Sequence, residues 1–293
     1  MALTDDQING WAKPPSQTES EKCENAISQA SDVLRAHFGN VITFIRQGSH
    51  RNRTNIRVDS DVDIALVHTG FEFTDPSAMS EADKAVFQAN RIAAKYTFGQ
   101  FKADVHTVLA AKFGGDNVQR KNKCIRILGN SNRVNADIVP AYEHRRLKAN
   151  GQIGAQGITF VADSGGRINS FPEQHYANGV AKNEATSKAF KSTVRVLKNI
   201  RNRLVEQGTI DKDLMPSHFL ECLVWNAPDY CFAHKTYRED AISVTARVWN
   251  DMRDGTSSKY AEVNDLLWLF QGSHRKPADA EAFMLEAWRS LKP

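Results

Sequence analysis

The sequence predicts an α+β protein in which strands and helices alternate in the N-terminal half and helices alone follow. Short runs rich in apolar and β-branched residues indicate strands up to about residue 170, whereas helical spacing of apolar residues dominates from residue 181 onward. This order of elements is typical of an α/β lobe packed on a helical lobe. A cleft between two such lobes is the usual place for a ligand.

The N-terminal half is expected to alternate helices with strands. Apolar residues at helical spacing predict a helix over 19–38, and Gly39 ends it. Segment 80–113, before Gly114, is expected to be rich in helix. Short apolar runs predict strands near 41–46, 61–68, 123–128 and 133–139, and a strand or hairpin over 157–170.

The C-terminal part is expected to be helical. A long helix over 181–206 is followed by a mostly helical remainder that ends at Pro293. We therefore expect a core over residues 1–180 and a helical domain over 181–293 that completes the cleft. One apolar stripe of the long helix is formed by Phe190, Val194, Leu197, Ile200 and Leu204.

Composition places the chain among ordinary globular proteins. It has 293 residues, 41% of them hydrophobic and 25% charged, and a net charge of +4. That mild charge suits a groove for phosphates without demanding DNA as a partner. The sequence contains no apolar stretch near twenty residues and no signal peptide, and its four cysteines lack zinc spacing. We expect a cytoplasmic protein with reduced thiols and no membrane segment.

Two acidic motifs are the strongest indication of chemistry. Asp61 and Asp63 lie two residues apart in an apolar run, so they share one face of a predicted strand. Asp137 lies in a second strand-like run. If these strands are neighbours, the three carboxylates converge. Such a set can hold two Mg²⁺ ions about 3.5–4 Å apart, as in phosphoryl transfer. We expect Mn²⁺ to be able to substitute.

A Gly48-Ser49 turn precedes the acids. It follows a predicted strand and opens a helix, so backbone N–H groups and a hydroxyl are exposed there. These groups suit a triphosphate. Arg51, Arg53 and Arg57 add positive charge in the connecting stretch.

These motifs together resemble a known superfamily. The segments GSHRNRT, SDVDIALV and NADIVPA are similar to those of DNA polymerase β-type nucleotidyltransferases. Within that superfamily they resemble the CdnE-like bacterial cyclic-oligonucleotide synthases (CD-NTases) related to cyclic GMP-AMP synthase. The resemblance implies a polymerase β-like lobe with a mixed sheet. It is strong in the N-terminal half and extends, with less specific motifs, to about residue 230.

The predicted helix over 181–206 carries a row of basic residues beside its apolar stripe. Such a row is either a solvated basic edge or a surface that faces phosphate. The resemblance implies that Lys198 binds the triphosphate, with Lys191 and Arg195 as further candidates. The row consists of Lys188, Lys191, Arg195 and Lys198.

Two further segments are candidates for nucleotide contacts. Ser217 opens a helix, where its hydroxyl can either cap the helix or meet a phosphate. The resemblance implies a triphosphate contact for Ser217 and a base-stacking role for the next residue, which is commonly Tyr and here is His218. Asn169 either lies in a turn or pairs with the imide edge of uracil, since an amide offers both a donor and an acceptor.

The resemblance implies an enzyme that makes a cyclic di- or trinucleotide second messenger from NTPs, with UTP and ATP among them. Such messengers serve bacterial antiphage (CBASS) signalling and are read by a separate effector protein. We expect no obligatory DNA or RNA activator. Two alternatives stay open: a nucleotidyltransferase that modifies a small molecule, a protein or an RNA end, and a non-catalytic nucleic-acid-binding relative.

Overall fold

The computed structural model describes residues 3–56, 61–92 and 96–292, so Arg57 lies outside the described residues. The chain packs into two compact units. The sheet unit comprises Gln17–Gly48 and Ser60–Pro172, and the helical unit comprises Met1–Ser16, Ser49–Asp59 and Glu173–Pro293. No helix within the described ranges is long and apolar enough to cross a membrane.

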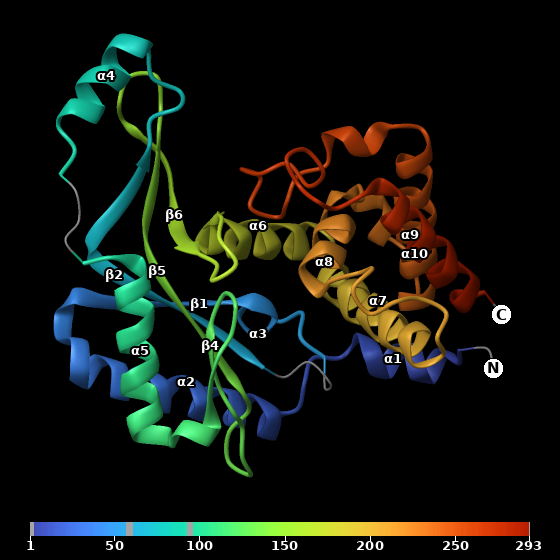
Figure 1. The fold of residues 1–293 in the computed structure, drawn as a ribbon. Helices are drawn as coiled ribbons and strands as arrows, with labels where there is room; N and C mark the ends of the chain where they lie inside the picture. The colour runs from blue at the N-terminus through green and yellow to red at the C-terminus, as the bar shows by residue number, and fades with distance from the viewer. Residues whose placement is uncertain (1–2, 57–60, 93–95, 293) are drawn as a thin grey trace. The chain divides into compact units, whose positions relative to one another are not determined.

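The sheet unit is built on a seven-stranded mixed sheet (Figure 1). Its main strand order is β1-β2-β5-β4-β3, and β6 joins β5 to β7. The β2–β5 pair is parallel and the other pairs are antiparallel. The strands are β1 (Ile42–Gln47), β2 (Val62–Asp75), β3 (Val118–Arg120), β4 (Ile125–Ile127), β5 (Ala136–Leu147), β6 (Ile153–Val161) and β7 (Arg167–Ser170).

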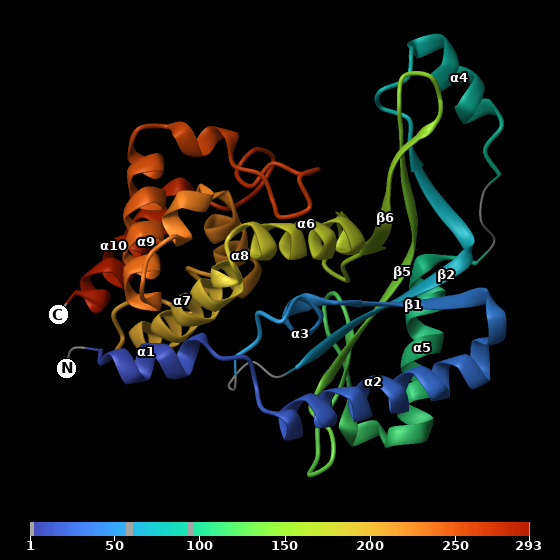
Figure 2. The same ribbon diagram turned by 180° about the vertical axis from the view of Figure 1, so that it is seen from behind.

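Helices cover one face of this sheet. α2 (Gln17–Phe38) and α5 (Phe98–Phe113) lie next to one another against it (Figure 2). Their apolar residues form one buried cluster with Val62, Ile64 and Leu66 of β2. Because side chains alternate along a strand, the odd-numbered residues of β2 project from the opposite face. The remaining helices of this unit are α4 (Glu81–Ala89) and two short 3₁₀ turns, Gly39–Val41 and Gly115–Asn117.

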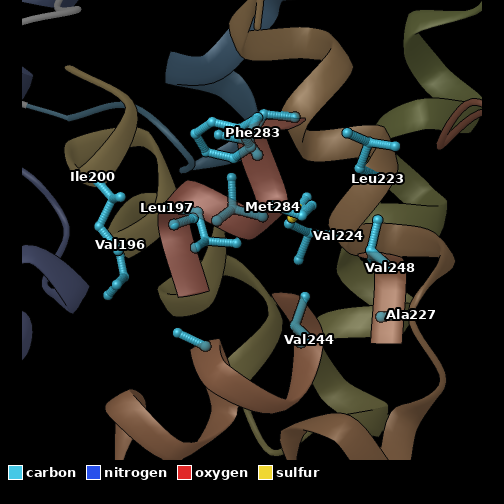
Figure 3. Packing of buried hydrophobic residues seen from close by; sticks show 14 of the residues in the cluster. Val196, Leu197, Ile200, Leu223, Val224, Ala227, Val244, Val248, Phe283 and Met284 are labelled. Carbon is cyan, nitrogen blue, oxygen red and sulfur yellow. The ribbon is translucent and has the colours of Figure 1, made fainter. Parts of the chain in front are cut away.

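The helical unit has its own apolar core (Figure 3). The predicted stripe from Phe190 to Leu204 is confirmed, because all five of its residues are at most 4% exposed. α7, α8, α9 and α10 all contribute side chains to this cluster. Two 3₁₀ turns, Asp229–Phe232 and Thr256–Lys259, also belong to this unit. The first residues of α3 and α6 are the last residues of sheet-unit segments. The α-helices of the helical unit are α1 (Asp5–Ala12), α3 (Gly48–Asn52), α6 (Pro172–Ala185), α7 (Ala189–Glu206), α8 (Ser217–Asn226), α9 (Tyr237–Arg253) and α10 (Pro277–Leu291).

The predicted fold class is confirmed, but the predicted single helix over 181–206 is wrong. Ser187 and Lys188 have φ angles of +50° and +72°, which end α6 before α7 begins. The Thr186 side chain accepts a hydrogen bond from the backbone N–H of Phe190 at 3.1 Å. A side chain therefore satisfies a free N–H at the start of α7, which makes the break stable.

Other differences concern the lengths of elements. The strands predicted at 61–68 and 133–139 run on to Asp75 and Leu147. The hairpin predicted over 157–170 is present as β6 and β7. The sequence analysis missed α1, β3 and α6. The division at residue 180 into core and helical domain stays a prediction, because units defined by packing need not fold or act separately.

Candidate functional site

The predicted convergence of the two acidic strands is confirmed. β2 and β5 are parallel neighbours, and their register pairs Asp63 with Asp137. Asp61 precedes Asp63 by two residues, so strand alternation points it to the same face. This is the face opposite α2 and α5. The fold thus brings three carboxylates to one place on the sheet.

An arginine that the sequence analysis missed neutralises part of this acid cluster. Arg126 on β4 is the register partner of Asp137. Its Nε and Nη2 donate to the two oxygens of Asp137 at 2.8 and 2.7 Å. The same Nη2 lies 3.1 Å from Asp61 Oδ2. Asp61 also accepts a hydrogen bond from Asn135 Nδ2 at 2.9 Å. The bond to Asp137 raises the pKa of Arg126 above its usual range.

The chemistry of the acid cluster fits a hard divalent cation. Its donors are carboxylate oxygens, the ligands that Mg²⁺ prefers, and the Asp61 and Asp137 side chains are 38% and 14% exposed. Across the part of the chain that the structure describes, no three acidic, histidine or cysteine side chains form a ready metal cage. Asp137 and Asp61 are instead arranged around the guanidinium of Arg126.

Gly48 is tied directly to the acid cluster. Its φ is +72°, and a Cβ built on it would lie 1.9 Å from Asp63 Oδ2. Only glycine allows both this backbone conformation and this approach. The backbone of Gly48 therefore packs against the Asp63 carboxylate. Ser49, the next residue, is half-buried in α3 and is assigned to the helical unit.

In the helical unit, Lys198 belongs to a buried polar network. Its side chain is 1% exposed, and Nζ donates to the carbonyl oxygen of Thr54 at 2.9 Å. The Thr54 hydroxyl donates to Glu221 Oε2 at 2.9 Å, and Glu221 Oε1 lies 3.1 Å from His175 Nε2. Thr54 N in turn donates to the carbonyl oxygen of Ser49 at 3.0 Å. Lys198 is thus linked through Thr54 to the Gly-Ser turn.

Glu221 is the anion of this network and is 3% exposed. Burial by itself raises the pKa of a carboxylate. The hydrogen bond with His175, the charge of Lys198 and the Thr54 hydroxyl outweigh burial here and lower the pKa of Glu221 to about 2. Thr54, Glu221 and His175 were not among the residues predicted from sequence.

Lys191 and Arg195 of the predicted basic row are also buried, so the interpretation as a solvated basic edge is wrong for them. Arg195 is 6% exposed, and it donates to the carbonyl oxygens of Ala12 and Arg53 at distances of 2.5–2.9 Å. Burial lowers the pKa of Lys191, whose Nζ lies 5.8 Å from the centroid of the Tyr176 ring. Lys188 is the exposed residue that precedes α7.

Arg51 lies near Lys191 on the same aromatic ring. Its guanidinium carbon is 4.7 Å from the Tyr176 centroid, and its two terminal nitrogens donate to Glu173 at 2.8 and 2.6 Å. Tyr176 is 38% exposed. Arg51 and Lys191 therefore both lie beside the partly exposed ring of Tyr176, and Glu173 balances the charge of Arg51.

Ser217 and His218 begin α8, as predicted. Ser217 is the first helical residue rather than the N-cap, and its hydroxyl accepts from Arg201 at 2.8 Å. The His218 side chain is 43% exposed, which leaves part of the imidazole accessible for stacking. Its Nδ1 lies 3.1 Å from Nη2 of Arg275. Arg275 is a further neighbour that the sequence analysis missed.

The structure does not bring Asn169 to the acid cluster. Asn169 pairs with Thr159, and Thr159 pairs with Tyr142, so these three residues share one face of the sheet. Asp137 is five residues before Tyr142 on β5, and strand alternation puts it on the other face. Thr159 Oγ1 contacts Asn169 Oδ1 at 2.8 Å, which holds the amide in place.

Comparisons with known proteins agree with this arrangement. Residues 177–292 match the family model of the cGAS/DncV-like nucleotidyltransferase C-terminal helical domain. The chain is 41% identical to a cyclic dipurine nucleotide synthase of Elizabethkingia meningoseptica, over 99% of both chains. It is 34% identical to the cyclic dipyrimidine nucleotide synthase CdnE of Cecembia lonarensis, over 99% of this chain and 98% of that one.

A solved structure extends the likeness to the whole fold. The CdnE cyclic dinucleotide synthase of Elizabethkingia meningoseptica, solved with GTP and Apcpp, superposes with a TM-score of 0.84 at 38% identity. The match covers 99% of this chain and all of that one. With the family model, it confirms the resemblance that the Gly-Ser turn and the three acids predict. The chain belongs to the bacterial cGAS/DncV-like nucleotidyltransferases of the CdnE type.

Proposed function

We propose that this protein is a cyclic oligonucleotide synthase that joins NTPs into a cyclic di- or trinucleotide. The observation that carries the proposal is the pairing of Asp63 with Asp137 on parallel neighbouring strands, with Asp61 just before β2 and 3.1 Å from the arginine that holds Asp137. Such a cluster suits phosphoryl transfer, and it lies in a chain whose whole length matches cyclic dinucleotide synthases. NTPs are the substrates, in keeping with the GTP and Apcpp of the Elizabethkingia structure.

The acids are proposed as the ligands of two Mg²⁺ ions, for which Mn²⁺ can substitute. When bound, the ions supply charge stabilisation to the attacking and leaving oxygens. Asp137 additionally orients the attacking ribose hydroxyl of the acceptor nucleotide and favours loss of its proton. That hydroxyl attacks the α-phosphorus of the donor, and pyrophosphate leaves. A second attack, by the free ribose hydroxyl of the linear product on the α-phosphorus of its remaining triphosphate, closes the ring and releases another pyrophosphate.

The donor triphosphate is proposed to bind through Ser49, Ser217 and Lys198. Ser49 and Ser217 are half-buried hydroxyls at the starts of α3 and α8. Lys198 is buried and bound to Thr54. We therefore propose that it acts by fixing the turn after Ser49 and by adding positive charge behind it. A direct bond from Lys198 to phosphate stays a prediction.

Other cations are proposed to have separate roles. Lys191 and Arg51, which both lie beside the accessible ring of Tyr176, are proposed to add positive charge on the substrate side. The carbonyl contacts of Arg195 give it a structural role. His218 is proposed to stack on the donor base.

The choice of base is proposed to include a pyrimidine, with UTP and ATP among the substrates. The relatives make dipurine and dipyrimidine products, so family membership alone does not select the base. Asn169 supports the proposal because its amide offers one donor and one acceptor to an imide edge and is held by Thr159. The base is the part of an NTP farthest from its α-phosphate, so a residue that recognises it need not lie beside the acids.

The product is proposed to act as a second messenger in bacterial antiphage signalling and to be read by a separate effector protein. Its NTP substrates are those of the cytoplasm, which is therefore the proposed location. No DNA or RNA activator is included in the proposal.

Incubation of the purified chain with α-³²P-labelled NTPs and Mg²⁺ tests this function. We expect pyrophosphate release together with a labelled product that resists phosphatase, because a ring has no terminal phosphate. A label transferred to an RNA end, a protein or a small molecule would replace the proposal with the modifying-enzyme alternative. Nucleic-acid binding without pyrophosphate release would favour the non-catalytic alternative.

A further inference from the structure

Arg126 occupies the place of a counter-ion in the acid cluster. It holds both oxygens of Asp137 and lies 3.1 Å from Asp61. Two carboxylates this close to one another repel unless a cation lies between them. In the sheet unit that cation is a side chain supplied by the neighbouring strand β4.

The sheet unit contains a second pair in which an arginine donates two hydrogen bonds to an aspartate, an arrangement called a fork here. It provides a comparison for Arg126 and Asp137. Arg120 on β3 donates to the two oxygens of Asp163 at 3.0 and 2.9 Å, a geometry close to that of Arg126 and Asp137. Lys102 also contacts Asp163, so that carboxylate lies between two cations. At the acid cluster the ratio of cations to carboxylates is reversed, because two carboxylates share one guanidinium.

We propose that Arg126 is a positioning residue that orients Asp137 and neutralises the Asp61–Asp137 pair until a divalent ion binds. Arg126 thereby sets the affinity of the acid cluster for the ion before nucleotide arrives. The inference rests on the proposed function, since it takes the acid cluster to be the metal site.

Two consequences follow from the geometry. Without Arg126 the cluster carries one more unit of net negative charge, so a divalent ion is attracted more strongly. Asp137 also loses the two bonds that fix its carboxylate, so the attacking hydroxyl is less well oriented. Removal of Arg126 should therefore tighten metal binding and slow the reaction, a combination that general damage to the site would not produce.

Titration of nucleotide-free protein with Mn²⁺, followed by electron paramagnetic resonance, tests the proposal. We expect Arg126→Gln to bind Mn²⁺ about tenfold more tightly than the wild type, about 1.4 kcal/mol. Arg120→Gln is the matched control: it removes the same charge from the same kind of fork, and its Mn²⁺ affinity should equal that of the wild type. Equal or weaker binding by Arg126→Gln would overturn the proposal.

Arg126→Lys tests the orienting role and remains informative if the Gln variant does not fold. It keeps the charge but cannot form the two-bond fork, so Mn²⁺ affinity should stay within about twofold of the wild type while kcat falls about tenfold with little change in KM. An unchanged kcat would overturn the orienting role. If neither the wild type nor any variant makes product but Arg126→Gln still binds Mn²⁺ tenfold more tightly than the wild type, the proposed function fails and the role of Arg126 in metal binding stands.

Discussion

The acid cluster of the sheet unit and the basic residues of α7 look alike in sequence, as short rows of like charge, but they differ in structure. Asp61 and Asp137 are 38% and 14% exposed and share one arginine. Lys198 and Arg195 are almost fully buried and donate to backbone carbonyl oxygens. In the proposal above, the acids exchange their arginine partner for a bound ion, whereas these two cations hold the backbone carbonyl oxygens of loops.

This difference separates two kinds of functional residue. A charge that acts on substrate must remain accessible and incompletely neutralised, as the acid cluster does. A buried charge with full hydrogen bonding rigidifies the structure around it. Substitutions in the two regions should therefore differ: changes in the acid cluster should remove activity at little cost in stability, and changes in the buried network should cost stability first.

The largest effect is expected for the double variant Asp61→Asn, Asp63→Asn. It removes two of the three carboxylates, so cyclic product should fall at least ~10³-fold. The thermal midpoint should hold or rise, because two like charges at close range are removed. Product assays and differential scanning calorimetry on the same preparation measure both effects. Product at the wild-type rate would rule out the acid cluster as the site of the reaction.

Gly48→Ala should nearly abolish activity through one contact. The new Cβ would lie 1.9 Å from Asp63 Oδ2, so the carboxylate must move, and a displacement of about 1 Å can cost about 10²-fold in rate. Gly39→Ala is the matched control, since its φ of +63° imposes similar backbone strain with no atom within 4 Å. Both should lose about 1–2 kcal/mol of stability. Equal activities for the two variants would exclude the contact with Asp63 as the cause.

Glu221→Gln should lower stability more than activity, the reverse of what is expected for the acid-cluster variants. The pKa of Glu221 is lowered to about 2, so its ionised form stabilises the fold above its unfolded pKa, and this contribution disappears as pH falls. Between pH 6 and 8 the free energy of unfolding of the wild type should exceed that of the variant by about 3 kcal/mol. This difference should shrink below about pH 4.5. Urea unfolding across this range measures the gap.

The control for this titration is Glu206→Gln, which changes an exposed glutamate at the end of α7. Its stability should match that of the wild type within about 0.5 kcal/mol across the same pH range. A gap between wild type and Glu221→Gln that is independent of pH would mean that the carboxylate charge is not what the buried network needs.

The smallest effect is expected for Asn169→Ser. Serine lacks the reach to make both contacts to an imide edge, and each lost hydrogen bond is worth about 0.5–1.5 kcal/mol. UTP use should fall severalfold relative to purine NTPs, with total turnover nearly unchanged. Competition between UTP and ATP in one reaction measures the ratio. If the ratio is unchanged, Asn169 serves only as the partner of Thr159.

The acid cluster was predictable from sequence because all but one of its determinants are local. Alternation along one strand aligns Asp61 with Asp63, and only the pairing of two strands was needed to add Asp137. Arg126 was not predictable in the same way. Its role depends on the register of β4 against β5, which no spacing along the chain reveals.

The carbonyl contacts of the basic residues of α7 were not predicted, for a related reason. Charge beside an apolar stripe is usually solvated, but here loop carbonyls distant in sequence, those of Ala12, Arg53 and Thr54, satisfy the buried donors. The break between α6 and α7 was missed because it depends on a side-chain acceptor, Thr186, rather than on a glycine or proline.

Mass spectrometry of the product made from an equal mixture of the four NTPs tests the central claim most directly. The wild type with Mg²⁺ should yield a cyclic di- or trinucleotide whose mass shows no terminal phosphate, and the Asp61→Asn, Asp63→Asn variant should yield none. A linear product alone, or a cyclic product that persists in the variant, would contradict the claim that the acid cluster makes a cyclic nucleotide.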